Sequence, residues 1–329
     1  MALSATDSAA EIVFDRATKR YPGRPQPAVN ELSLVIPAGE ICVLVGPSGG
    51  GKTTAMKMVN RLISITEGDI TIDGTSVRSL DLTTLRRGIG YVIQQVGLFP
   101  HLSVGDNIGT VPRLLGWPKK RIRASAEELL ELVGLEKADA ARYPGQLSGG
   151  QRQRVGLARA LAANPPLMLM DEPFGAIDPI TRERLQDEFL RLHREFRKTV
   201  IFVTHDIDEA IKMGDRIAIL HQGGILAQYD TPDEILANPA NEFVERFVGA
   251  DRGLKRLSLR RLRDVGLEPA SDAASDAPRC PASTTLHDAL SLMLTDGAHE
   301  VVAIDDDGEA MGMLSLRRIS DLLQERITA

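Results

Sequence analysis

Short apolar runs alternate with segments of helical periodicity through most of this chain. The runs at 41–45, 167–170 and 200–203 contain only apolar residues, which is typical of strands buried on both faces. Apolar residues recur at helical spacing in the segments that follow or precede these runs, at 54–62, 151–163 and 181–196. Strands that alternate with helices predict an α/β fold built around a parallel sheet.

Other segments extend this pattern. The first 40 residues contain the strand-like stretches 13–14 and 32–36, and 69–74 alternates like a half-exposed strand that ends in a turn. Residues 110–135 are predicted to be mainly helical, with the clearest amphipathic pattern near the end of that segment.

The last 80 residues show a weaker pattern that begins near residue 251. Residues 269–281 are rich in Ala, Ser, Asp and Pro, so we expect a linker over about 251–281. Beyond it the pattern predicts a helix, a strand, a turn, a second strand and a last helix, at 284–293, 301–304, 305–308, 311–315 and 319–324. The run Asp305 to Asp307 is interpreted as a solvated turn.

Composition narrows the class of protein. The net charge of −6 and the pI near 5.6 argue against nucleic acid as the main partner. No apolar run reaches the roughly 18 residues that a membrane-spanning helix needs, and residues 1–10 do not resemble a signal peptide. The two cysteines, Cys42 and Cys280, offer no disulfide framework. We therefore expect a cytosolic setting.

The most specific motif follows the apolar run at 41–45. It fits the P-loop pattern G-x-x-x-x-G-K-[ST] and consists of Gly46, Pro47, Ser48, Gly49, Gly50, Gly51, Lys52 and Thr53. In a P-loop, the backbone N–H groups and the helix N-terminus cradle phosphates, so Thr54, at the start of the helix, is included. Lys52 is expected to reach the β- and γ-phosphates of ATP, and Thr53 to ligate Mg²⁺. The alternative is a glycine-rich turn that binds nothing, although every fixed position of the motif is filled.

Asp171 and Glu172 follow the apolar run at 167–170. Ligands of parallel sheets bind at the carboxyl ends of strands, so Asp171 is expected to hold Mg²⁺. Side chains alternate along a strand, so Glu172 points away from Asp171 and is assigned as the base that polarises the attacking water. The alternative is a polar strand end without chemistry.

A second glycine-rich segment, at 147–151, leads directly into a predicted helix. Ser148, Gly149, Gly150 and Gln151 would make a second anion site on the same chain. Taken alone, this segment is only a helix-capping turn. One nucleotide does not need two such sites from one subunit, which favours a head-to-tail homodimer in which this loop caps the γ-phosphate bound by the partner's P-loop.

Together these motifs resemble the ATP-binding-cassette (ABC) ATPases, over about residues 12–249. The resemblance implies a P-loop NTPase of the ABC fold within residues 1–250, with a helical subdomain at about 96–160. The last segment, 282–329, resembles a single cystathionine-β-synthase (CBS) motif, a small α+β region. The family's CBS motifs place an Asp after the second strand where this chain has Arg318, which puts adenosine binding by the tail in doubt.

The resemblance also assigns roles to single residues. Gln94 matches the Q-loop glutamine that contacts Mg²⁺ and the attacking water, and His205 matches the switch histidine at the γ-phosphate. Asp178 closes the D-loop segment 175–178, which communicates across the dimer. Tyr21 matches the aromatic residue that stacks on adenine. For His205 and Tyr21, the plain alternative is a structural residue.

Further resemblances point to an importer. Segment 94–101 is similar to that of importers in which the surface after the Q-loop receives a permease helix, with an apolar patch at 98–100, although Phe99 and Pro100 could equally anchor a loop. Segments 57–62 and 247–252 and the pair Gln94-Gln95 look like those of osmoprotectant importers, which take up glycine betaine, choline, carnitine or proline betaine. This implies separate integral-membrane permease subunits, an extracytoplasmic substrate-binding protein and a peripheral position on the cytoplasmic face of the membrane.

Three alternatives remain at this point. An importer ATPase for another small solute, such as an amino acid, is the nearest rival. A soluble ABC protein of translation or DNA repair usually has two cassettes or long coiled-coil insertions, and neither pattern is visible in the sequence. A nonhydrolytic, nucleotide-gated regulator is disfavoured by Glu172 and His205.

Overall fold

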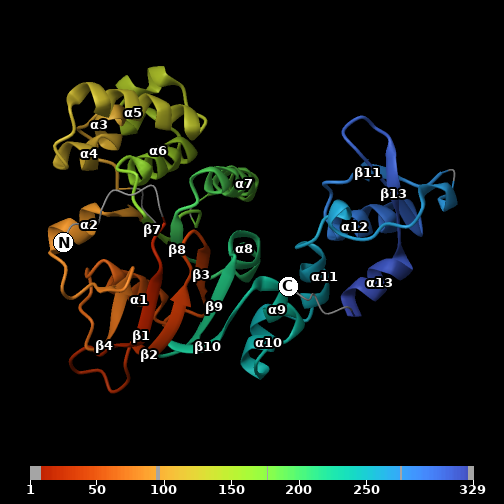
Figure 1. Ribbon diagram of the computed structural model, residues 1–329, viewed down its shortest axis with the longest axis horizontal. Coiled ribbons are helices and arrows are strands. Elements are labelled where there is room, and N and C mark those ends of the chain that lie inside the picture. The colour runs from red at the N-terminus through yellow and green to blue at the C-terminus, as the bar shows by residue number, and fades with distance from the viewer. Residues whose placement is uncertain (1–8, 94–96, 176, 275, 325–329) are drawn as a thin grey trace. The chain divides into compact units, whose positions relative to one another are not determined.

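The computed structural model describes residues 9–93, 97–175, 177–274 and 276–324. It divides into two compact units, Met1–Tyr229 and Asp230–Ala329 (Figure 1). Each unit has its own sheet structure and its own hydrophobic core.

A six-stranded sheet forms the centre of the first unit, in the order β10-β9-β3-β8-β7-β6. Its strands, in sequence order, are β3 Ile41–Val45, β6 Ile89–Val92, β7 Leu167–Asp171, β8 Thr199–Val203, β9 Arg216–His221 and β10 Ile225–Asp230. The pairs β3–β8, β3–β9, β7–β8 and β6–β7 are parallel. The prediction of an α/β fold with a parallel sheet is confirmed, and β3 and β8 are buried along their whole length.

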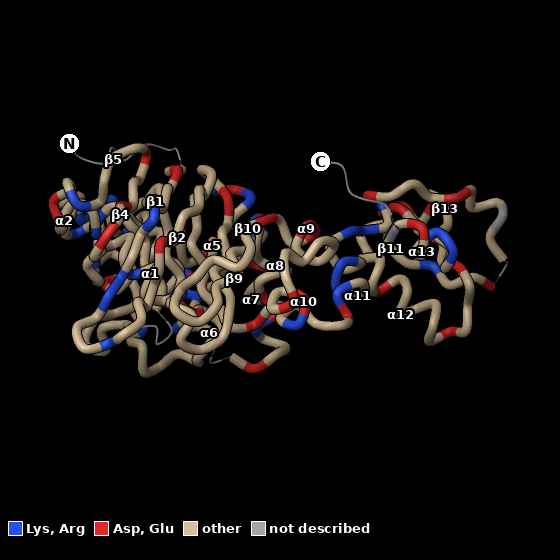
Figure 2. The backbone as a smooth tube through the Cα atoms, turned by 90° about the horizontal axis from the view of Figure 1, so that it is seen from below, with Lys and Arg blue, Asp and Glu red and all other residues tan. Residues whose placement is uncertain are grey.

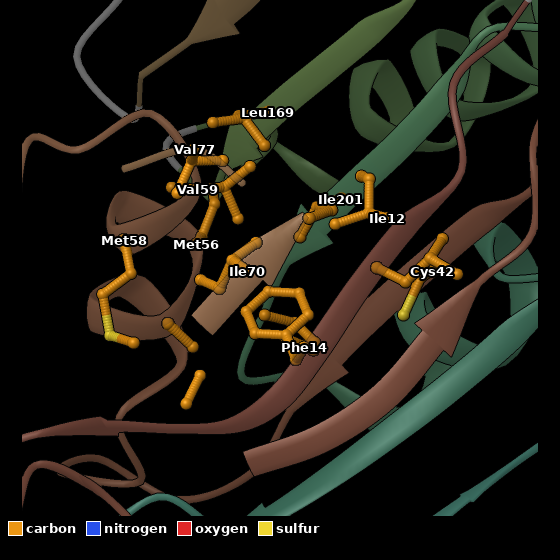
Figure 3. Close-up of a cluster of buried hydrophobic side chains, with 14 of the residues drawn as sticks. Ile12, Phe14, Cys42, Met56, Met58, Val59, Ile70, Val77, Leu169 and Ile201 are labelled. Carbon is orange, nitrogen blue, oxygen red and sulfur yellow. The ribbon is translucent and has the colours of Figure 1, made fainter. Parts of the chain in front are cut away.

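A second, antiparallel sheet has the order β2-β1-β4-β5. Its strands are β1 Ile12–Lys19, β2 Val29–Ile36, β4 Glu67–Ile72 and β5 Thr75–Ser76. Side chains from this sheet meet those of helix α1, Lys52–Val59, and of the parallel sheet in one buried cluster. Figure 3 shows Phe14 and Ile70 from the antiparallel sheet, Met56 from α1, and Leu169 and Ile201 from the parallel sheet. This cluster fixes α1 against both sheets.

Between β6 and β7 the chain forms a group of helices. Their bounds are α3 Val104–Ile108, α4 Thr110–Leu114, α5 Lys119–Leu132 and α6 Gly149–Leu161, with short 3₁₀ turns at Lys137–Ala141 and Pro144–Gln146. They share a core of their own, in which Ile108, Leu130 and Val155 are buried. The predicted helical content of 110–135 is confirmed by α4 and α5.

Two helices begin earlier than apolar spacing predicts. Helix α6 begins at Gly149 because the hydroxyl of Ser148 accepts from the N–H of Gln151 and caps the first turn. Helix α7, Pro179–Phe196, begins after Asp178, whose carboxylate caps it in the same way. The remaining helices of this unit are α2, Leu82–Arg87, and α8, Ile207–Met213.

The second unit starts with three short helices and continues into a small α/β region. Its helices are α9 Pro232–Ala237, α10 Glu242–Val248, α11 Arg252–Leu257, α12 Leu286–Asp296 and α13 Leu316–Gln324. Its sheet consists of β11 Arg279–Pro281, β12 Glu300–Ile304 and β13 Ala310–Ser315. The predicted order of helix, strand, turn, strand and helix is confirmed from α12 to α13.

The segment 251–281, expected to be a linker, is largely structured. It contains α11, 3₁₀ turns at Leu262–Asp264 and Ala270–Asp272, and β11, which pairs in parallel with β12. Leu257, Leu262 and Cys280 are buried in the core of the second unit. The composition of this segment is polar, but these three side chains are part of that core.

Basic and acidic residues are interspersed along the backbone. Blue and red segments intermingle in Figure 2, as expected for a chain with 39 basic and 45 acidic residues. Within the ranges that the structure describes, no helix combines the length and the apolar character needed to cross a membrane.

Candidate nucleotide-binding site

The loop between β3 and α1 adopts a conformation that requires glycine. Gly46, Gly49 and Gly51 have φ angles of 147°, 80° and 77°. A Cβ atom on Gly46 would lie 2.1 Å from the carbonyl oxygen of Leu220, and one on Gly51 would lie 2.2 Å from that of Ala28. The glycines therefore bring the loop close against neighbouring backbone, in the kind of tight turn from which a phosphate cradle is built.

Lys52 lies at the centre of this loop. Its Nζ donates to the carbonyl oxygens of Gly46 and Pro47, at 2.7 and 2.9 Å. Burial lowers the pKa of Lys52, and the negative charges of Glu172 and Asp171 partly oppose this effect. The two carbonyls hold the ammonium group in the loop, where phosphate oxygens can replace them as acceptors.

Thr53 and Asp171 are brought together at the end of β7. The Oγ1 of Thr53 donates to Oδ1 of Asp171 at 2.9 Å, and Nζ of Lys57 lies 3.5 Å from Oδ2. A hydroxyl and a carboxylate are oxygen ligands of the kind that Mg²⁺ prefers, so these residues fit that ion. Lys57 is not among the site residues that the motifs predict. Its position four residues after Thr53 places it on the same face of α1, and this spacing is the signal that indicates it.

Glu172 occupies an unusual backbone conformation beside His205. Its φ angle is 46°, in the left-handed region that non-glycine residues rarely adopt, and its N–H donates to the carbonyl of Val203 at 2.9 Å. Its Oε1 lies 3.2 Å from Nδ1 of His205, whose side chain is 64% exposed. Asp171 and Glu172 thus have different partners. Glu172 and His205 form a pair beyond the carboxyl ends of β7 and β8.

Ser148 and its neighbours face a separate hollow. Ser148 and Gln151 form a capping box, since the N–H of Ser148 donates to Oε1 of Gln151 at 2.9 Å. Ser148, Gly149 and Gly150 line an open hollow of about 700 Å³ together with Ile177 and Asp178. Among the described residues, this lining includes none of the P-loop.

The segment that ends in Asp178 turns toward this hollow. The carboxylate of Asp178 accepts from the N–H of Thr181 at 3.0 Å, and hydrogen bonds from Thr181 lower the pKa of Asp178. Nη2 of Arg182 donates to the carbonyl of Ile177 at 3.0 Å. Ala176, in the middle of the predicted D-loop, lies outside the described residues.

Three predicted residues remain: Gln94, Tyr21 and Thr54. Gln94 lies outside the described residues, so the structure does not address its predicted role. Tyr21 is half-buried, and Nζ of Lys19 lies 5.0 Å from the centre of its ring. Thr54 is the third residue of α1, within the first turn, where backbone N–H groups lack partners inside the helix.

The site therefore consists of two parts. The structure brings Lys52, Thr53, Asp171, Glu172 and His205 together around the P-loop. It places Ser148, Gly149, Gly150 and Asp178 around the separate hollow.

Comparison with known proteins shows which families this chain resembles. The family model described as ABC transporter matches residues 29–175, and the CBS domain model matches residues 270–325. The osmoprotectant import ATP-binding protein OsmV of Salmonella typhimurium is 49% identical, over 93% of this chain and 79% of the relative. The glycine betaine uptake system ATP-binding protein YehX of Escherichia coli is 45% identical, over 95% of this chain and 99% of the relative.

Solved structures show the same fold. The dimeric structure of MJ0796, a bacterial ABC transporter cassette, is 36% identical with a TM-score of 0.60, and it covers 67% of this chain and 98% of that chain. A dimeric post-hydrolysis state of the same cassette, bound to ADP and Pi, has a TM-score of 0.59 at 36% identity, with the same coverage of both chains. This chain therefore belongs to the ABC transporter family, as an ATP-binding and ATP-hydrolysing subunit that carries a C-terminal CBS domain.

Proposed function

We propose that this protein hydrolyses ATP between two copies of itself and thereby drives an importer of quaternary-amine osmoprotectants such as glycine betaine. The observation that supports the two-copy site is the separation of its parts. Lys52 and Glu172 gather around the P-loop, whereas Ser148 and Gly150 line a hollow that the P-loop does not reach. In a head-to-tail pair, the hollow of one copy would receive the γ-phosphate bound by the other.

In this proposal, ATP is held by the P-loop and by the edge of the parallel sheet. The loop N–H groups and Lys52 bind the phosphates, because Lys52 can exchange its two carbonyl partners for phosphate oxygens. Thr53 and Asp171, and Gln94 by family resemblance, would hold Mg²⁺, which neutralises charge on the phosphates. Tyr21 would stack on the adenine ring.

Glu172 and His205 are proposed to act on the attacking water and the γ-phosphoryl group. Glu172 accepts the proton of the water while His205 donates a hydrogen bond to the γ-phosphate. Their contact of 3.2 Å supports roles for both groups at one point of the site. Ser148 and Gly150 of the partner copy would add donors on the opposite side. Phosphoryl transfer depends mainly on such positioning and on charge.

The surface after β6 is proposed to receive the permease. Phe99 is 43% exposed and lines a hollow of about 340 Å³ together with Tyr91, Val111 and Pro165. A short permease helix with an apolar side chain would fit such a hollow. The protein would then lie on the cytoplasmic face of the membrane, and an extracytoplasmic binding protein would deliver the solute to the permease.

The solute class is proposed from the relatives. OsmV, named for osmoprotectant import, and YehX, named for glycine betaine uptake, are 49% and 45% identical over 93% and 95% of this chain. The subunit itself does not touch the solute, so an importer of another small solute, such as an amino acid, is the second candidate.

The C-terminal region is proposed to regulate transport. It comprises about residues 282–329, after the ATP-binding region within 1–250, and it would pair with another copy because it holds one CBS motif. Arg318, whose N–H donates to Oγ of Ser315, stands where an acidic residue would contact ribose. A role in dimerisation or in charge sensing is therefore an equal candidate beside adenosine binding.

Uptake of labelled glycine betaine tests the proposal. It is measured at high and low osmolarity in cells that carry the wild-type protein or Lys52→Ala. We expect uptake to be lost in the variant. Equal uptake in both strains, with intact ATPase activity of the purified wild-type protein, would discard the osmoprotectant assignment.

A further inference from the structure

A buried polar contact joins α7 to α8, the helix that begins two residues after His205. Nε2 of Gln186, in α7, donates to Oε1 of Glu209, in α8, at 2.9 Å. The two residues are only 5% and 9% exposed. Burial raises the pKa of Glu209, because its charged form loses hydration. A buried carboxylate is costly, and it is not needed to pack two helices together.

The same carboxylate holds the loop that carries His205. The N–H of Glu209 donates to Oδ1 of Asp206 at 3.3 Å, and hydrogen bonding with the buried hydroxyl of Thr204 lowers the pKa of the Glu209 carboxyl. The Oγ1 of Thr204 in turn accepts from the N–H of Asp206 at 3.1 Å. His205 lies between Thr204 and Asp206 in the sequence. The contacts of these two neighbours therefore restrict the backbone on both sides of His205.

On its other side, α7 contacts the segment at 177–178, which lines the hollow near Ser148. Arg182 lies one helical turn before Gln186 on α7, and its positive charge lowers the pKa of Glu209. Its Nη2 donates to the carbonyl of Ile177, at the rim of the hollow. The Nε of Arg182 is buried and lacks a hydrogen-bond partner among the described residues. The guanidinium group is therefore fixed to Ile177 by a hydrogen bond, and its charge acts on the carboxylate of Glu209.

We propose that Glu209 is a positioning residue that ties the loop of His205 to α7, so that the segment at 177–178 and His205 move together. A second copy that docks against Ile177 and Asp178 would then set the position of His205 in the first copy. This inference rests on the proposed role of His205 at the γ-phosphate. It adds a residue that acts through His205 and does not touch the nucleotide.

A second tie between the same helices provides a matched control. Nζ of Lys212, in α8, lies 2.8 Å from Oδ1 of Asp187, in α7, and the Asp187 side chain is 64% exposed. This ion pair joins α7 to α8 without touching Thr204 or Arg182. If Glu209 only held the two helices together, loss of either tie would have similar effects on hydrolysis.

The test measures phosphate release by the purified full-length chain at increasing ATP concentrations. The variants are Gln186→Leu, Glu209→Ala, their double variant, Glu209→Gln and the control Asp187→Asn. We expect Gln186→Leu and Glu209→Ala to lower kcat about tenfold with KM within about twofold, because binding is intact and only positioning is lost. The double variant should be no slower than Glu209→Ala, since both changes break one tie.

Glu209→Gln should retain kcat within about threefold, because its amide can still accept from Thr204 and pair with Gln186. Asp187→Asn should stay within about twofold of the wild type, since exposed ion pairs contribute little. If Glu209→Ala does not fold, Gln186→Leu, Thr204→Val and their double variant provide the same cycle.

Three results would overturn the inference: unchanged kcat in Gln186→Leu and Glu209→Ala, multiplicative effects in the double variant, or an equal loss in Asp187→Asn. His205→Ala separates this inference from the proposed function. If His205→Ala leaves kcat unchanged, the role of His205 itself is wrong. If it lowers kcat while Gln186→Leu and Glu209→Ala do not, only the positioning role of Glu209 is wrong.

Discussion

At the scale of single residues, the site combines a strained glutamate, the proposed base, with a buried lysine. Glu172 is held at a φ angle of 46° by its hydrogen bond to the carbonyl of Val203. Such a conformation costs about 1–3 kcal/mol and persists only where the surroundings enforce it. Lys52 is held against two carbonyls in the glycine loop. Both residues are thus placed before ATP arrives.

Replacing Glu172 should separate binding from hydrolysis. Glu172→Gln keeps the size of the side chain and removes the base, so we expect hydrolysis to fall by about 100-fold or more while ATP still binds. Phosphate release and equilibrium binding of a fluorescent ATP analogue measure the two properties. Normal turnover in this variant would show that Glu172 is not the base.

Replacing Lys52 should weaken binding itself. A charge-assisted hydrogen bond to phosphate contributes about 1.5–3 kcal/mol, so Lys52→Ala should raise the Kd for ATP by about 10- to 100-fold. Lys120→Ala, an exposed lysine in α5, is the control and should bind normally. The P-loop assignment would not survive an unchanged Kd in Lys52→Ala.

At the scale of elements, the turn from α7 to β8 is predicted to be sensitive to acid. His193, in the last turn of α7, is buried and its Nε2 lies 2.7 Å from the carbonyl oxygen of Lys198. Burial lowers the pKa of His193 below the ordinary value of 6.5, against opposing effects of the Lys198 carbonyl and Asp215. The folded state therefore binds this proton less readily than the unfolded state. The free energy of unfolding should fall as the pH drops through 6.5 toward the lower folded-state pKa.

Urea unfolding at about pH 7.5 and about pH 5.5, without nucleotide, measures this effect. His193→Gln can keep the bond to Lys198 and cannot be protonated, so it should lose less stability between the two pH values than the wild type does. An equal loss in both proteins would remove His193 as the cause.

The sequence predicts the elements well where one physical signal dominates. Buried parallel strands such as β3 and β8 are continuous apolar runs, and the P-loop needs its glycines for the close approach of the backbone to Leu220. β11 was missed because three residues in a polar segment carry no periodicity, although Cys280 is buried there. The contacts of Lys57 and Glu209 were missed because they depend on how helices pack, which a linear pattern does not contain.

At the scale of the whole molecule, the proposed hydrolysis of ATP requires a second copy of the chain. The P-loop group and the Ser148 group are both built by the first unit, yet the hollow that the Ser148 group lines includes none of the P-loop residues. A neighbour with 36% identity and a TM-score of 0.60 is a dimeric ABC transporter cassette. In a closed twofold pair, each surface is used twice, so two composite sites would form.

Complementation between two inactive variants tests whether each ATP site is built from two copies of the chain. Copies with Lys52→Ala are mixed with copies carrying Ser148→Arg, and phosphate release is measured for each variant alone and for the mixture. A head-to-tail pair of unlike copies has one site with both faults and one intact site. Each variant alone should be inactive. Their equal mixture should regain about a quarter of the wild-type rate, because half of the pairs are mixed and each mixed pair has one intact site out of two. A mixture as inactive as its components would contradict the account, because it would place both groups in one copy's site.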